Sequence, residues 1–135
     1  MAHGGLEAMC ELASTSRSDK VHRQVARGIF ALTCRSEVRV RLVKCGGLTS
    51  LVRLLSSRQK DLKRDAAGAL GNIAMSPNLV SDVVNAGALP PLIDLAKSSV
   101  EIDLKREVVR TLYVLSYEET TRRYVLQCSL IVSLY

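Results

Sequence analysis

The sequence predicts an all-α solenoid, a stack of similar helical units, and three observations support this prediction. First, KCGGLTSLVRLLSS at 44–57 aligns with NAGALPPLIDLAKS at 85–98, an offset of 41 residues that is typical of α-solenoids. Second, each unit contains three segments whose apolar residues recur with helical spacing. Third, the chain has one Phe, four Tyr and no Trp, and a core of Leu, Val, Ile and Ala suits closely packed helices.

The repeat extends beyond this pair of segments. An offset of 41 residues places Ile29 on Leu70, and an offset of 42 residues places Leu70 on Leu112. The one-residue difference fits the loop around 98–102, where an insertion costs little. We therefore treat residues 1–135 as a single solenoid domain.

The chain begins in the middle of a unit. Residues 5–14 predict the second helix of that unit and residues 19–34 its third helix, with Asp19 as a candidate N-cap. We assign residues 4–34 to this partial repeat.

The first complete unit is predicted over residues 37–76. Its helices are expected at 37–44, 48–55 and 61–75. Gly46 and Gly47 end the first of these helices, because glycine accepts the backbone conformation of a helix terminus. Pro77 ends the third, because the residue before a proline avoids the α region.

The second complete unit is predicted over residues 78–117. Its second helix opens with Pro90 and Pro91, which a first helical turn accepts because its amides have no partner. A truncated repeat follows over 119–135. It is predicted to hold a first helix at 118–127 and the start of a second at 129–135.

The unit resembles the armadillo repeat. The resemblance is carried by the segments at 44–57 and 85–98 and by AAGALGNIA at 66–74, and it covers essentially the whole chain. It implies a right-handed α-α superhelix of about three repeats, each with three helices. The related HEAT repeat is the main alternative, and the glycine-bounded short first helix and the Ala-Leu-x-Asn-Ile-Ala segment favour armadillo.

Both ends of the chain fall inside a unit, and no polar capping helix is evident. A solenoid needs caps to cover its last apolar faces. We therefore expect a fragment of a longer solenoid, with self-association through the uncapped ends as the alternative. The apolar, β-prone tail at 130–135 is an aggregation hazard if it is left uncovered.

Arginines recur on one face of the predicted third helices. In the helix at 61–75, Arg64, Gly68, Asn72 and Met75 are spaced to lie opposite the apolar core face. The repeat offsets place two arginines at the position of Arg64 and two at the position of Gly68. The predicted binding residues are Arg23, Arg27, Arg64, Gly68, Asn72, Arg106 and Arg110.

The resemblance implies that this face lines a concave groove that holds extended peptides. Armadillo grooves commonly use a ladder of Asn residues to bind the peptide backbone, and here only Asn72 matches, while Ala31 and Val114 depart from it. The Trp residues of importin-like grooves are absent. Arginine holds carboxylate and phosphate groups through its planar fork of donors. We therefore expect an acidic or phosphorylated peptide partner, as in the catenin-type groove.

Two questions stay open at this stage. The arginine stripe is also compatible with a merely solvated helix face, because Arg is a good helix former and the acids Asp65 and Glu107 lie nearby. Gly68 either lets a ligand backbone approach or allows tight helix packing. For Gly71, tight packing between neighbouring helices is the preferred interpretation.

Three other function classes are an enzyme, an adaptor arm and a nucleic-acid-binding protein. No catalytic, nucleotide-binding or metal-binding signature occurs, so we expect a non-enzymatic interaction scaffold without a cofactor or metal. An adaptor arm of a larger protein such as a ubiquitin ligase is one alternative. Nucleic-acid binding, compatible with the net charge of +6, is another. It is disfavoured because only Tyr113 and Tyr117 accompany the arginines.

The four cysteines indicate the compartment. Their spacing matches no zinc or redox motif, and we interpret them as free thiols that are mostly buried. No signal peptide is visible, and the longest uncharged stretch, 66–81, is too short to span a bilayer. A cytoplasmic or nuclear protein without a transmembrane segment is expected.

Overall fold

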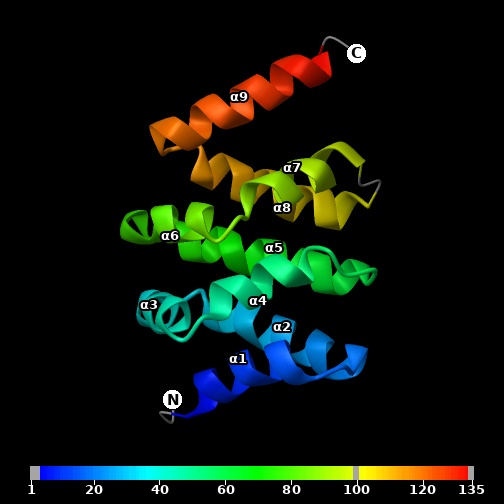
Figure 1. The fold of residues 1–135 in the computed structure, drawn as a ribbon, viewed down its shortest axis with the longest axis vertical. Coiled ribbons are helices and arrows are strands. Elements are labelled where there is room, and N and C mark those ends of the chain that lie inside the picture. Colours follow the sequence, from blue (N-terminus) through cyan, green and yellow to red (C-terminus); the bar gives the residue numbers. More distant parts are fainter. Residues whose placement is uncertain (1–3, 99–100, 134–135) are drawn as a thin grey trace.

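The computed structural model describes residues 4–98 and 101–133, and it confirms the prediction of an all-α solenoid. Helices stack in chain order along the long axis of the molecule (Figure 1). The elements are α1 (Gly5–Thr15), α2 (Asp19–Leu32), α3 (Ser36–Lys44), α4 (Gly47–Leu54), α5 (Lys60–Ala74), the short 3-10 helix η1 (Pro77–Leu79), α6 (Val80–Asn85), α7 (Leu89–Ser98), α8 (Ile102–Leu115) and α9 (Glu119–Ser133).

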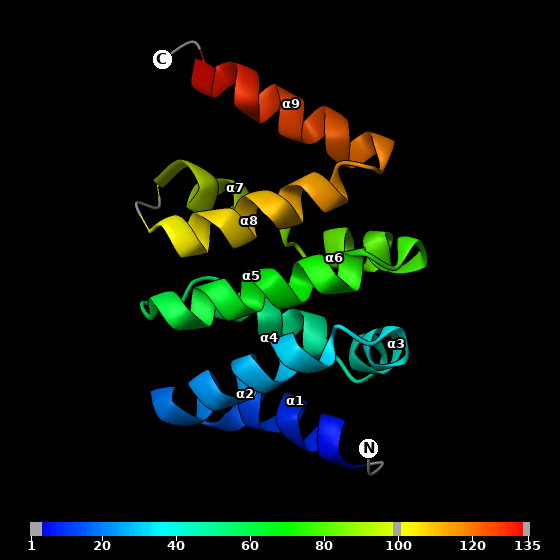
Figure 2. The same cartoon turned by 180° about the vertical axis from the view of Figure 1, so that it is seen from behind.

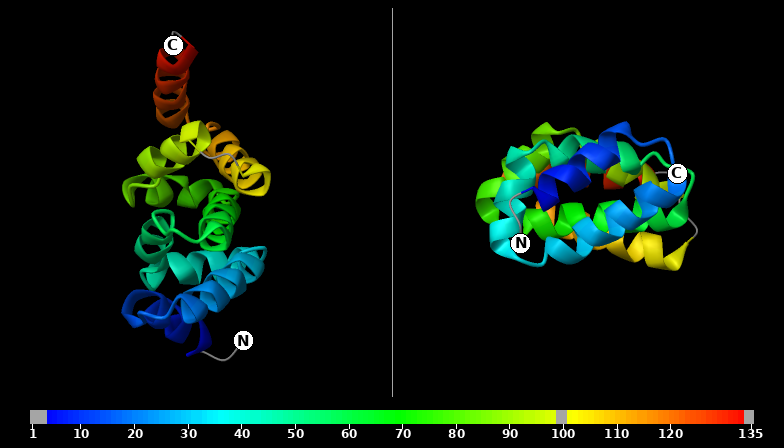
Figure 3. Two further views of the ribbon diagram at one scale, coloured as in Figure 1. Left: turned by 90° about the vertical axis from the view of Figure 1, so that its right-hand side faces the viewer. Right: turned by 90° about the horizontal axis from the view of Figure 1, so that it is seen from below.

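Three long helices form one layer of the stack. α2, α5 and α8 lie side by side on the face seen in Figure 2, and the helices that precede each of them form the opposite layer in the left view of Figure 3. α5 is the central member. Its residues Ala66, Ala67 and Ala69 are fully buried, and such small side chains let α2 and α8 approach α5 closely from its two sides.

The core follows the predicted apolar periodicity. Leu6, Ile29, Leu70, Leu92 and Leu115 are among its largest fully buried side chains, and they come from five different helices. Full burial of each such side chain contributes about 1.5–3 kcal/mol. The core is therefore continuous along the stack.

Glycine ends the short first helices, as predicted. Gly46 and Gly87 have φ angles of +82° and +86°, in the left-handed region. Among the described residues, positive φ values occur only at glycine. An L-residue with a side chain would be strained there, so glycine at this position lets the chain turn sharply from α3 into α4 and from α6 into α7.

The predicted break in the last repeat is wrong. Helices were expected at 118–127 and 129–135, whereas α9 runs without interruption from Glu119 to Ser133, and residues 134–135 lie outside the described part of the chain. An offset of 42 residues from Gly87 falls on Ser129, so the glycine that permits the turn is missing there. The helix continues because no residue at this point favours the left-handed conformation.

The predicted N-cap of α2 is also displaced by one residue. Ser18, rather than Asp19, occupies the cap, and its hydroxyl accepts a hydrogen bond from the Val21 amide at 3.4 Å. Asp19 is the first residue of the helix, where its negative charge interacts favourably with the positive end of the helix dipole.

No single helix in the described residues has the length and apolar character needed to cross a membrane. One pair of short helices, Pro77–Asn85 and Leu89–Ser98, reaches that length and composition only when taken together, and the pair is bent by 83°.

Candidate functional site

The candidate site is the outer surface of α2, α5 and α8, which carries Arg23, Arg27, Arg64, Arg106 and Arg110. We call this surface the arginine face. The three helices lie next to one another in the stack, so the structure brings the predicted arginines onto neighbouring helices of one layer (Figure 2). Their environments differ, however, and each side chain has to be considered by its own contacts.

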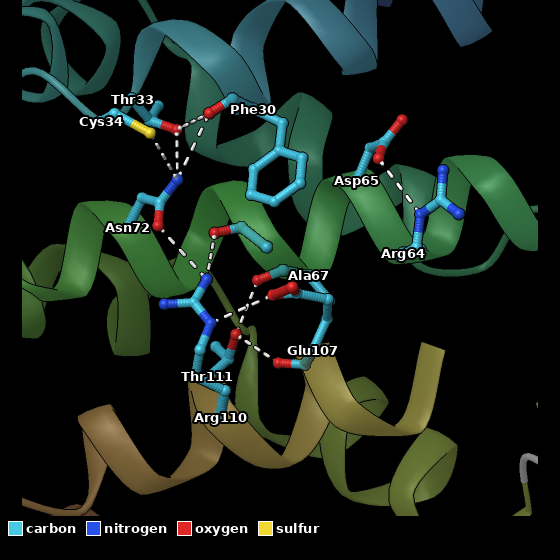
Figure 4. Close-up of polar contacts among 11 residues, drawn as sticks. Phe30, Thr33, Cys34, Arg64, Asp65, Ala67, Asn72, Glu107, Arg110 and Thr111 are labelled. Carbon is cyan, nitrogen blue, oxygen red and sulfur yellow. Dashed lines mark hydrogen bonds and ion pairs between the residues drawn. The ribbon is translucent and has the colours of Figure 1, made fainter. Parts of the chain in front are cut away.

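Asn72 is buried, contrary to the prediction that it faces solvent. Only 7% of the residue is exposed. Its amide nitrogen donates to the Phe30 carbonyl oxygen at 3.3 Å and to the Thr33 hydroxyl at 3.1 Å, and its oxygen accepts from Arg110 Nη2 at 3.2 Å (Figure 4). Asn72 thus connects all three helices of the layer.

Arg110 completes this connection from α8. Its Nη2 also donates to the Gly68 carbonyl oxygen at 3.1 Å, and its Nε donates to Glu107 Oε1 at 3.0 Å. One third of the side chain remains exposed. Arg110 therefore acts mainly as a bridge between α5 and α8, and a ligand would have to compete with these contacts.

Gly68 lies beneath an aromatic ring, which favours tight helix packing over the approach of a ligand backbone, the two interpretations that the sequence left open. A Cβ atom at Gly68 would lie 2.6 Å from Cε1 of Phe30. The ring covers the glycine from the α2 side, as Figure 4 shows for Phe30 above α5. The absence of a side chain serves helix packing here.

Gly71 has the packing role that the sequence favoured. A Cβ atom there would lie 2.6 Å from the Thr111 hydroxyl and 3.1 Å from Arg110 Nη2. The Thr111 hydroxyl donates to the Ala67 carbonyl oxygen at 2.7 Å, which holds α8 against α5 at the same point. The close contact between these helices depends on the missing side chain.

The remaining four arginines differ in how strongly other side chains hold them and in how much of each side chain is exposed. Arg23 donates to Gln59 Oε1 at 3.0 Å, and Arg64 Nε lies 3.5 Å from Asp65 Oδ1. Arg27 is exposed. Arg106 keeps 73% of its side chain exposed and only approaches Asp103, at 3.9 Å.

Arg64 has 36% of its side chain exposed, close to the value for Arg110, but it pairs with Asp65 of its own helix, as Arg106 pairs with Asp103. We therefore regard Arg27, Arg64 and Arg106 as the members of the arginine face most available to a ligand. Arg23 and Arg110 hold neighbouring helices together instead.

A shallow hollow separates α2 from α5 on this face. It has a volume of about 390 Å³ and is lined by Arg27, Phe30, Ala31, Cys34, Arg64 and Asp65. Asp65 is buried, and burial raises the pKa of its carboxyl group although the Arg64 guanidinium opposes the shift. Its Oδ2 atom has no hydrogen-bond partner in the described residues.

Sequence reasoning did not include a second, apolar hollow in the candidate site. It lies between the ends of α5 and α8 and has a volume of about 590 Å³. Its lining includes Met75, Tyr113 and Tyr117, which are all more than half exposed. The available signal was the repeat offset, which places Met75 and Tyr117 at the same position of successive third helices.

The chain belongs to the Armadillo/beta-catenin-like repeat family, whose profile matches residues 35–75 and 76–117. Vacuolar protein 8 of Schizosaccharomyces pombe is 28% identical over 130 residues, covering 96% of this chain and 24% of that protein. Human catenin delta-2 is 27% identical over 101 residues, covering 72% of this chain and 8% of that protein. The chain thus spans about a quarter, or less, of the length of these relatives.

Solved structures show the same fold. An engineered protein with 28% identity has a TM-score of 0.84 and covers 93% of this chain and 31% of its own. A designed armadillo repeat protein, solved in complex with the peptide (KR)4, also has a TM-score of 0.84, with 22% identity, and covers 93% of this chain and 53% of its own. The armadillo resemblance drawn from the sequence is confirmed.

Proposed function

We propose that this chain is a non-enzymatic scaffold that binds an extended, acidic or phosphorylated protein segment along the arginine face. The observation that carries the proposal is the placement of Arg27 and Arg64 at the rim of the hollow between α2 and α5, with Arg106 exposed on α8. Nearby acids offset part of this charge, because Asp65 lies 3.5 Å from Arg64 and Asp103 lies 3.9 Å from Arg106. Arg27 is exposed beside the hollow and adds its charge to this surface.

An extended segment fits the spacing of the layer. Packed helices lie roughly 8–10 Å apart, and an extended chain rises about 3.3 Å per residue. About three residues of a ligand would therefore pass from one long helix to the next. A segment with an acidic residue at about every third position would present one carboxylate to each helix in turn.

Arginine suits this ligand better than lysine does. Its guanidinium binds carboxylate or phosphate through two parallel hydrogen bonds, and such charge-assisted bonds each net about 1.5–3 kcal/mol where water is excluded. At exposed positions the contribution falls to about 0–1 kcal/mol. Affinity would then come from several weak contacts along the face, and it would fall as the salt concentration rises.

The ligand that we propose is acidic, whereas the designed armadillo repeat protein described above was solved with a basic peptide. A basic segment would meet Arg27, Arg64 and Arg106 directly and would be repelled. The same arginines would attract a nucleic acid as well, and a larger protein could use the face as an adaptor arm, for example within a ubiquitin ligase. Exposed aromatic side chains do not alternate with the arginines, so we favour the peptide.

Binding of fluorescein-labelled Asp-Ser repeat peptides, with and without phosphate on serine, tests the proposal by fluorescence anisotropy. Substitution of Arg27, Arg64 and Arg106 by Glu is expected to weaken binding at least tenfold. The matched control changes Arg17, Arg53 and Arg58 to Glu, three exposed arginines that line a different hollow, and is expected to weaken binding less than threefold. Equal losses in both variants, or tighter binding of a labelled oligothymidine than of either peptide, would contradict the proposal.

A further inference from the structure

The apolar hollow lies at one end of the arginine face, where α5, the start of the following repeat and α8 meet. Its lining is chiefly Met75, Pro77, Val80, Tyr113, Val114 and Tyr117. Met75 is 55% exposed, Tyr113 64% and Tyr117 70%, so three large side chains face solvent at one place. Contiguous exposed apolar surface of this kind marks interaction sites.

The two tyrosines support each other. Their ring centroids lie 5.4 Å apart in an edge-to-face arrangement, and their hydroxyl groups are within hydrogen-bond distance at 2.9 Å. Paired contacts at both the ring and the hydroxyl reduce the freedom of the two side chains. A preorganised aromatic wall loses little entropy on binding, and aromatic residues are frequent anchors of interfaces.

The lining of the hollow is apolar and aromatic apart from Ser81 and one acidic residue. Glu118 is the acidic residue of the lining, and its carboxylate already accepts hydrogen bonds from the Thr120 and Thr121 amides at 3.0 and 2.8 Å. Arg106 and Arg110 precede Tyr113 on α8 and favour acidic residues on any ligand that continues past them.

We propose that the segment bound to the arginine face inserts one bulky apolar side chain, such as Leu, Met or Phe, into the hollow beside Met75, Tyr113 and Tyr117. This inference rests on the proposed function and narrows the ligand class to an acidic segment with an apolar anchor. The acidic residues would provide attraction over a distance, and the anchor would fix the register of the segment.

Selection of random twelve-residue peptides displayed on phage, using the full chain as bait, tests the inference. Wild type is expected to enrich Asp and Glu together with one apolar residue at a fixed position. Changing Tyr113 and Tyr117 to Ala is expected to abolish the apolar preference and keep the acidic one, whereas Tyr124→Ala, an exposed tyrosine on α9, is expected to change neither.

Three outcomes distinguish the two proposals. Acidic enrichment without an apolar position overturns the anchor and leaves the arginine face in place. Enrichment of apolar peptides without acidic residues overturns the proposed function. No enrichment at all overturns both.

An independent observation concerns two thiols. The sulfur atoms of Cys10, on α1, and Cys45, directly after α3, lie 2.9 Å apart although the residues are 35 positions apart in the sequence. Cys10 is buried, and Cys45 is partly exposed. The thiols therefore meet between the first partial repeat and the next unit.

We infer that Cys10 and Cys45 form a site of reversible oxidation, at which a hydroperoxide converts the two thiols into a disulfide. In the first step the Cys45 sulfur attacks a peroxide oxygen, the O–O bond breaks, and a sulfenic acid and water (or an alcohol) result. The Cys10 sulfur then attacks the Cys45 sulfur, the S–O bond breaks, and water leaves with the Cys10 proton. The thiols lose two electrons, which the peroxide gains.

The two sulfur atoms differ in burial, and we therefore expect them to react in different steps. Burial, with further contributions from the Cys45 hydrogen bond and charge, raises the pKa of Cys10 to about 12. Cys10 therefore remains a thiol near neutral pH, and the more accessible Cys45 reacts with the peroxide. The cross-link would tie α1 to the turn before α4 and restrict the unfolded chain, which raises the melting temperature.

Peptide mapping without reductant tests this inference on the full chain after hydrogen peroxide treatment. We expect a Cys10–Cys45 cross-linked peptide, its reversal by dithiothreitol, and a melting temperature raised by roughly 6–15 °C. Cys34→Ser is expected to retain the cross-link, and Cys45→Ser to lose it. Oxidation of the exposed Cys34 without a Cys10–Cys45 peptide, in wild type, would overturn the inference.

Discussion

At the scale of single residues, the side chains that the repeat pattern places at the ligand surface divide into two groups. Asn72 and Arg110 hold the helices of the layer together, whereas Arg27, Arg64 and Arg106 remain available. The sequence could not separate these groups, because helical periodicity gives a direction around the helix axis and does not give the depth of the neighbouring groove. The ring of Phe30, for example, fills the space above Gly68.

Asn72→Ala tests the structural role of the buried amide. The change removes one partner of the Thr33 hydroxyl and one partner of Arg110. We expect a loss of about 1–3 kcal/mol in the free energy of unfolding, measured with urea. Asn78→Ala, at an exposed position, serves as the control and should change stability by less than about 0.5 kcal/mol. Equal effects of the two substitutions would contradict the assigned role.

Gly71→Ala tests the contact between α5 and α8. Alanine favours helices, yet its Cβ atom would meet the Thr111 hydroxyl at 2.6 Å, so we expect a loss of about 1–3 kcal/mol in urea unfolding. Gly28→Ala is the matched control, because its Cβ atom would meet only the mobile end of Met9. It should be neutral or stabilise by up to about 1 kcal/mol. A stabilising Gly71→Ala would refute the close contact.

Asp65 gives a prediction about pH. Because burial raises its pKa in the folded state, the folded chain keeps a proton that the unfolded chain loses as pH rises above about 4. The contribution of Asp65 to the free energy of unfolding therefore falls with rising pH until its raised pKa is passed.

Urea unfolding of wild type and Asp65→Asn across this range measures the effect. The stability of the variant relative to wild type should increase with pH and then level off. A relative stability that decreases with pH would mean that the carboxylate is favoured in the folded state, which contradicts the burial of Asp65.

At the scale of elements, the sequence predicted most of the helices because apolar spacing, proline and glycine mark their ends directly. The ends of α3 and α6 follow from Gly46 and Gly87, and the end of α5 from Pro77. The prediction failed for α9, where the repeat pattern was extended through Ser129 without a glycine to support the turn. A helix end is therefore predicted more reliably from a glycine at the turn than from the repeat alignment alone.

Gly87→Ala tests this requirement at the turn between α6 and α7. At a φ of +86° a side chain is strained, and we expect a loss of about 1–2 kcal/mol in thermal or urea unfolding. Gly87→Asn should lose less, because asparagine tolerates the left-handed region better. If alanine and asparagine behave alike and neither destabilises the chain, the turn does not depend on backbone conformation.

At the scale of the whole molecule, the stack presents one layer of long helices, and we propose that the charge, spacing and hollows of this layer suit an extended ligand. The fold class and the family could be predicted from the repeat, because each unit carries the same apolar spine. The sequence could not predict which arginines of the face are available to a ligand, because this depends on contacts between units, such as the hydrogen bond from Arg110 to Asn72. The apolar hollow likewise arises only where α5, α6 and α8 meet.

The central claim is that an acidic segment lies on the arginine face. An NMR titration of the isotope-labelled chain with an Asp-Ser repeat phosphopeptide tests it most directly. We predict that the largest chemical-shift changes occur at Arg27, Arg64 and Arg106 and at their neighbours on α2, α5 and α8. Changes concentrated on α4 and α7, in the opposite layer, or no changes at a large excess of the peptide, would contradict the claim.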